Sequence, residues 1–167
     1  SELGNPPSKF ERVFRKAKGA GFKLVAHAGE EGPAEYVWEA LNLLHADRID
    51  HGNRCLEDEK LVEELAERKI GLTVCLLSNL KLCVVDDLKK HPLKTMLEKG
   101  LKPSINSDDP AYFGGYMNAN YLTTAEALNL TKEELAEVAK ISFETSFLPA
   151  SQKEECMQLV DDYLVLN

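Results

Sequence analysis

The sequence predicts an α/β fold built on a parallel β-sheet, and two observations support this class. Short apolar segments of strand length alternate with amphipathic helical segments between residues 22 and 107. Reactive polar side chains follow each predicted strand. Because parallel strands all end on the same side of a sheet, these side chains are expected to share one rim, as in doubly wound sheets and barrels.

Composition narrows the class of protein. The chain has 28 acidic and 20 basic residues among 167, and this net charge of −8 disfavours nucleic acid as a partner. A content of 44% hydrophobic and 29% charged residues is typical of one globular domain, here spanning residues 1–167. No apolar run approaches the roughly 20 residues that cross a bilayer, and no signal-peptide core is seen. We therefore expect a cytoplasmic protein with no membrane partner.

Length and cysteine content add two constraints. A complete (β/α)8 barrel takes about 250 residues, so a barrel formed by this chain would be incomplete. The cysteines at positions 55, 75, 83 and 156 are irregularly spaced and include no C-x-x-C pair. We interpret them as reduced, mostly buried thiols.

The first predicted elements are a helix, a strand and a second helix. Apolar residues recur every three or four positions over residues 8–19, with Ser8 as the N-cap. Residues 22–27 form an apolar run of strand length, and the small-residue loop 28–33 follows it. Residues 33–45 return to the helical pattern, with proline in the first turn and one apolar face.

The same alternation continues along the chain. We predict strands and helices in turn at residues 48–51, 58–69, 71–75, 88–99 and 101–107. The glycine- and aromatic-rich residues 108–121 are predicted to form an irregular loop or short helix. Two capping-box sequences, T-x-x-E and S-x-x-E, begin the last helices, at 131–147 and 151–166.

Each predicted strand is followed by groups with catalytic potential. In chain order these are His27 and Glu30, Asp50 and His51, Ser78 and Asn79, and Asp108 and Asp109. Neutral histidine and carboxylate are ordinary zinc ligands, which makes His27 and Asp108 candidates for a metal site. Glu30 and His51 would supply acid–base and orienting groups, and Gly29 would let the backbone approach a flat ligand.

Structural roles are the alternative interpretation. A strand-end histidine often only hydrogen-bonds its neighbours, and Asp-Asp-Pro is a common turn, but the coincidence of four such pairs favours a site. We assign His45 and His91 to structure, and Ser78 and Asn79 stay open between lining a pocket and capping a loop. An aromatic cluster is interpreted as core packing rather than as a base-stacking platform: Tyr112, Phe113, Tyr116 and Tyr121.

Longer motifs cover the same strand ends. They are VAHAGEEG (25–32), RIDHG (48–52), C-x-L-S-N (75–79) and INSDDPAYFGGY (105–116). In this order and spacing the chain resembles the adenosine/adenine deaminase family of zinc hydrolases, and its adenine deaminase branch in particular. The resemblance implies the second half of a (β/α)8 TIM barrel, with about four parallel strands alternating with helices, plus C-terminal helices.

The resemblance also implies roles for matching residues. His27 and Asp108 would be Zn²⁺ ligands. Glu30 would protonate the purine ring nitrogen beside the attacked carbon, which requires a raised pKa. His51 would take the proton from the zinc-bound hydroxide or orient it. Asp109 would hold the hydroxide or the imidazole edge of the purine, and Gly29 would present its backbone amide to the ring.

The implied reaction is the hydrolytic deamination of adenine to hypoxanthine, or of adenosine to inosine, with release of ammonia. Deamination of a methylated adenine nucleotide is a further alternative. Two departures from the family are clear: Leu76 stands where the family has proline, and the His-x-His pair that supplies two further zinc ligands is absent. We therefore expect this chain by itself to bind zinc weakly or not at all and to be inactive.

The open sheet of a half-barrel has consequences for association. Its unpaired edges predict either a homo-oligomer or pairing with the missing N-terminal half. The alternative function is a non-catalytic half-barrel module that self-associates.

Overall fold

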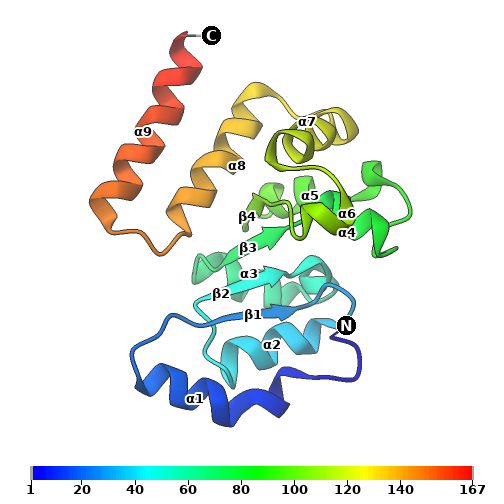
Figure 1. The fold of residues 1–167 in the computed structure, drawn as a ribbon, viewed down its shortest axis with the longest axis vertical. Helices are drawn as coiled ribbons and strands as arrows, with labels where there is room; N and C mark the ends of the chain where they lie inside the picture. Colours follow the sequence, from blue (N-terminus) through cyan, green and yellow to red (C-terminus); the bar gives the residue numbers. More distant parts are fainter. Residues whose placement is uncertain (1, 167) are drawn as a thin grey trace.

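The computed structural model describes residues 2–166 and contains one parallel sheet within them. Its strands lie in chain order and are β1 Val25–Ala28, β2 Arg48–His51, β3 Gly71–Val74 and β4 Lys102–Ile105 (Figure 1). Each strand pairs with the next, and the register places His27 beside Asp50 and Asp50 beside Thr73. All four carboxyl ends therefore lie on the same side of the sheet.

Helices connect the strands and bury one face of the sheet. They are α2 Ala34–Asn42 after β1; the 3-10 helix η2 Asn53–Glu57 and α3 Glu59–Glu67 after β2; and α4 Leu76–Lys81, η3 Leu88–Lys90 and α5 Leu93–Glu98 after β3. Alternate strand residues such as Ile49 and Leu72 pack into the same buried cluster as Leu41 and Leu65 of the helices. The other strand positions, including His27 and the half-buried side chain at 50, face away from this cluster.

The two ends of the chain add further helices. At the N-terminal end, η1 Pro7–Phe10 leads into α1 Glu11–Gly19; after β4 come α6 Pro110–Phe113, α7 Met117–Leu128, α8 Lys132–Glu144 and α9 Ala150–Leu166. The helix α8 packs on β4, where Lys102 pairs with Glu144 at 2.8 Å. The helix α9 contacts α8 and extends away from the sheet (Figure 1). No helix within residues 2–166 is long and apolar enough to cross a membrane.

The predicted strands and their order are confirmed, and three local corrections apply. The first strand begins at Val25 rather than at residue 22, because Phe22 is exposed and the chain turns through Gly21 to reach the sheet. The predicted helix 88–99 is wrong as a single helix. It breaks between η3 and α5 because a residue before proline avoids the helical region, and His91, before Pro92, is extended.

A third correction concerns the segment after β3, for which no helix was predicted. Residues 76–81 form α4, and Leu76, which stands at the family's proline position, is fully buried at its start. Ser78 and Asn79 are therefore held rigidly on a short helix inside the protein.

Two predictions about burial hold only in part. All four cysteines are free thiols, as predicted. Burial was predicted for most of them, but only Cys55 and Cys75 are buried. Core packing is wrong for Tyr112 and Tyr116, which are 83% and 72% exposed because α6 and the turn after it lie on the surface. Tyr121 does pack against the core.

Candidate active site

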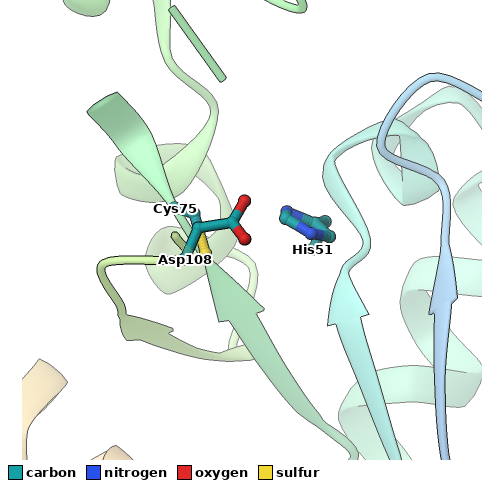
Figure 2. A group of neighbouring side chains, drawn as sticks. All are labelled: His51, Cys75 and Asp108. Atoms are coloured by element: carbon teal, nitrogen blue, oxygen red, sulfur yellow. The ribbon is translucent and has the colours of Figure 1, made fainter. Parts of the chain in front are cut away.

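The carboxyl rim of the sheet brings two of the predicted groups, His51 and Asp108, together with Cys75, which was not predicted as a ligand, and the predicted ligand His27 is not part of this cluster. His51 is the last residue of β2, Cys75 directly follows β3, and Asp108 lies three residues after β4. Figure 2 shows the Asp108 carboxylate pointing toward the His51 ring, with the Cys75 sulfur beside it. One ligand atom from each lies within 4.8 Å of the others, so three strand ends converge on one point.

His51 is held in an unusual backbone conformation. Its φ is +67° and that of Gly52 is +76°, so the chain turns sharply as it leaves the strand. The His51 ring is 2% exposed and its centroid lies 4.9 Å from that of His27. Burial, reinforced by His27, lowers the pKa of His51 to about 4, which keeps the ring neutral at physiological pH.

Glu30 lies in the loop after β1 and is only 8% exposed. The side-chain amide of Asn79 donates a hydrogen bond of 2.7 Å to Glu30 Oε1, and His51 Nδ1 lies 3.2 Å from the same oxygen. Burial raises the pKa of Glu30 to about 7, and the negative charge of Asp108 adds to the shift. A carboxyl group with this pKa is able to carry a proton at neutral pH.

Asp108 is oriented by a hydroxyl group. The Ser78 hydroxyl donates a 2.6 Å hydrogen bond to Asp108 Oδ2, and Asp108 adopts a left-handed φ of +54°. The question left open for Ser78 is thus answered in favour of the site, since it contacts one of the rim carboxylates rather than only capping a loop.

His27 is positioned by the neighbouring strand. Its side chain is 62% exposed, and its Nδ1 lies 3.4 Å from Asp50 Oδ2. Asp50 is itself held by the Thr73 hydroxyl, which donates at 2.7 Å, and by Arg48 in a 3.6 Å ion pair. A carboxylate beside Nδ1 favours a proton on that nitrogen and leaves Nε2 as the unprotonated, ligand-ready atom. Sequence reasoning placed Asp50 at the rim but gave it no role.

Gly29 and Asp109 occupy contrasting positions. At Gly29 φ is +75°, and a Cβ would lie 2.7 Å from a methyl group of Val37, so the tight loop leading to Glu30 requires glycine. Asp109 is exposed and its carbonyl accepts hydrogen bonds from the first turn of α6. Among the described residues its carboxylate makes no hydrogen bond to the other rim groups, so the structure does not gather Asp109 with them.

A second layer of polar groups lies behind Glu30. Asn53, Asn79 and His91 are all buried, and both Asn53 and His91 hydrogen-bond to Asn79 Oδ1. His91, which was assigned to structure, is buried and contacts Asn79, Asn79 contacts Glu30, and Asn53 was not singled out at all. The signal that could have found Asn53 is weak, because an asparagine after a glycine is a common turn sequence.

The donor set fits a zinc ion in kind. His27 and Asp108 offer an imidazole nitrogen and a carboxylate oxygen, the ligand types that zinc takes. His51 Nδ1 is buried and, although Glu30 Oε1 lies 3.2 Å away, makes no well-directed hydrogen bond within residues 2–166, so it can bind a further polar group. Cys75 is a weaker donor, since burial raises the pKa of its thiol far above the usual range.

A parallel α/β sheet with imidazole and carboxyl groups at its carboxyl rim is the architecture of barrel hydrolases. The chain belongs to the adenosine deaminase family, whose sequence pattern matches residues 1–163. A curated relative named adenine deaminase, from Sphingopyxis alaskensis, is 60% identical over 163 residues, which are 98% of this chain and 48% of the relative.

Two crystal structures are similar to the fold. That of adenine deaminase from Arthrobacter aurescens has a TM-score of 0.96 and 48% identity, covering 98% of this chain and 50% of that one. An amidohydrolase from Burkholderia ambifaria, crystallised with bound Zn, has a TM-score of 0.88 and 27% identity, covering 100% and 49% of the two chains. The predicted family and the half-barrel fold class are confirmed, and the chain spans about half the length of these relatives.

Proposed function

We propose that this chain supplies the acid–base half of the active site of a purine aminohydrolase, with adenine as its first substrate. The observation that carries the proposal is the buried Glu30 carboxyl, whose raised pKa of about 7 accompanies a position beside His51 at the rim. The adenine deaminases among its relatives support adenine over adenosine or a methylated adenine nucleotide.

In this proposal Glu30 acts as the general acid. Its proton passes to the ring nitrogen next to the carbon that bears the amino group, which makes that carbon electrophilic. Water adds to the carbon, ammonia leaves, and adenine becomes hypoxanthine. The chemistry requires a carboxyl group that is protonated near neutral pH, and burial of Glu30 supports this.

His51, Gly29 and Asp109 complete the assignment. His51, neutral and buried, accepts a proton from the attacking water or orients it. The Gly29 amide faces the purine ring, and Asp109 holds the attacking water or the imidazole edge of the purine. Asp109 is exposed in this chain, so its role depends on surfaces outside residues 2–166.

His27 and Asp108 are the residues that would hold zinc. A zinc ion held there would lower the pKa of water and so would supply a nucleophile at neutral pH. Two protein ligands are fewer than the three or four of stable zinc sites, and this chain has no His-x-His sequence. We therefore propose weak or absent zinc binding by the chain alone and completion of the site by an N-terminal half or a partner copy, in a cytoplasmic protein of one domain over residues 1–167.

The test compares this chain alone with the chain mixed with the N-terminal half of the Sphingopyxis alaskensis relative. Zinc content and ammonia release from adenine and adenosine are measured in both samples. We expect zinc and adenine turnover only in the mixture, and zinc without turnover when the chain carries Glu30→Gln. A mixture with neither zinc nor turnover would overturn the proposal and favour the self-associating module, which light scattering detects as a homo-oligomer of the chain alone.

A further inference from the structure

The buried polar layer behind Glu30 is joined by hydrogen bonds whose directions follow from one another. His91, just after η3, is 3% exposed, and Asn79 on α4 is completely buried. His91 Nε2 lies 3.1 Å from Asn79 Oδ1, and Asn53 Nδ2 donates to the same oxygen at 2.8 Å. Asn79 Nδ2 in turn donates to Glu30 Oε1 at 2.7 Å.

The contact between Leu93 and His91 determines which atoms donate and which accept in this series of hydrogen bonds. The Leu93 backbone N–H donates to His91 Nδ1 at 3.2 Å, and a backbone N–H is only ever a donor. Nδ1 therefore carries no proton, and the proton of the neutral ring lies on Nε2. Burial lowers the pKa of His91 to about 3, so the ring stays neutral throughout the physiological range.

The ring direction then fixes the amide of Asn79. Both neighbours of Asn79 Oδ1, the His91 ring and the Asn53 amide, present N–H groups to it. Rotation of the amide by 180° would set Asn79 N–H groups against these two donors. The amide nitrogen of Asn79 must therefore face Glu30, and it donates to Oε1.

We propose that His91, acting through Asn79, is a positioning residue that keeps the proton of Glu30 on Oε2, the oxygen free to protonate the purine. This inference rests on the proposed function. Oε1 accepts the Asn79 N–H and also faces His51 Nδ1 at 3.2 Å, so it is the oxygen that the protein engages, and Oε2 is left for the proton and the substrate. If Asn79 turned its carbonyl oxygen toward Glu30 instead, that oxygen would accept the acid proton and withhold it from the substrate.

Two matched substitutions separate this role from a structural one. In His91→Gln the side chain is long enough to carry an N–H group to the place of Nε2, so donation to Asn79 is kept. In His91→Asn the short side chain still accepts from the Leu93 N–H but cannot reach Asn79. Both variants fill part of the same buried space with an amide, and thermal unfolding checks that each is folded.

Both variants are made in the assembled enzyme, and kcat and KM for adenine are measured against wild type. We expect His91→Asn to lose at least roughly tenfold in kcat with KM nearly unchanged, and His91→Gln to recover most of that loss, since general acids contribute roughly 10²–10⁴-fold. Equal kcat values in the two folded variants, or a loss confined to KM, would overturn the inference.

A second measurement needs no activity. Nitrogen-15 NMR of the histidine rings in this chain reports which nitrogen of His91 is protonated. We expect a neutral ring with the proton on Nε2 from pH 5 to 8, and a proton on Nδ1 would overturn the inference whatever the activity. A wild-type assembly that releases no ammonia overturns the proposed function instead, and the ring measurement still decides whether His91 holds Asn79 in place.

Discussion

The two sides of the carboxyl rim differ in how completely this chain builds them. On the β1–β2 side, Glu30 and His51 are buried, and Asn79 supports the acid from behind. On the side that follows β4, Asp109 is exposed, and Tyr112 projects into solvent from α6. This chain therefore encloses the acid with its own residues, so the first side is finished, whereas the side that follows β4 is exposed and left unfinished.

The largest expected effect tests the finished side directly. Glu30→Gln in the assembled enzyme removes the transferable proton while keeping the side-chain shape, so we expect a loss of about 10²–10⁴-fold in kcat. Ammonia release under saturating adenine measures it. A variant that turns over at a near-normal rate would remove Glu30 from the role of general acid.

The second prediction concerns the stability of the chain against pH. The pKa of Glu30 is raised from 4.5 to about 7 on folding, so the folded chain binds this proton more tightly than the unfolded chain. The stabilisation is fully present below pH 4.5 and is lost as pH rises through 7, a change of about 3 kcal/mol. His91 and His51 titrate over the same range with the opposite sign, so urea unfolding at pH 5 and pH 8.5 measures this change as the difference between wild type and Glu30→Gln.

Glu30→Gln is the control for that titration. Because glutamine does not ionise, the unfolding free energy of the variant at pH 8.5 minus that at pH 5 should exceed the same difference in wild type by about 3 kcal/mol. Parallel curves for the two proteins would show that Glu30 is not the group responsible.

A third prediction concerns His91, whose titration makes the folded chain less stable as the pH falls. Burial lowers the pKa of His91 from 6.5 to about 3, so the unfolded chain takes up this proton more readily than the folded one. The contribution of His91 to the unfolding free energy is complete above pH 6.5 and falls by about 2 kcal/mol by pH 5. In His91→Gln the unfolding free energy should fall less between pH 6.5 and pH 5, although His51 still contributes to the fall. If chemical unfolding shows the same pH dependence as wild type, His91 is not the group responsible.

The smallest effect is expected on the unfinished side. Tyr112→Ser removes an aromatic ring that is 83% exposed, so the unfolding free energy of the chain should change by less than about 0.5 kcal/mol. A loss of several kcal/mol in the chain alone would mean that the ring is buried in solution, most simply by self-association.

Local signals were sufficient for the order of the strands and for the residues at strand ends, but they missed the short helix α4. The break at His91–Pro92 was also readable, because proline restricts the residue before it, but the helical period of 88–99 was given more weight. The exposure of Tyr112 was not readable, since an aromatic side chain indicates burial without saying whether this chain or another surface provides it.

The contacts that orient the side chains at the rim could not be predicted from local sequence patterns. Asp50 and His27 are 23 residues apart, and only the pairing of β1 with β2 brings them together. Asn79 and Glu30 are separated by 49 residues along the chain. Residue types at strand ends thus predicted which groups share the rim, but not which neighbour orients each one.

The polar row formed by His27, Asp50 and Thr73 crosses three adjacent strands at paired positions. A slip of one residue between two strands exchanges the faces on which their side chains lie. The row can therefore form in only one alignment of the sheet. The contact that aims the His27 ring thus also distinguishes the correctly paired sheet from its nearest misfolded neighbours.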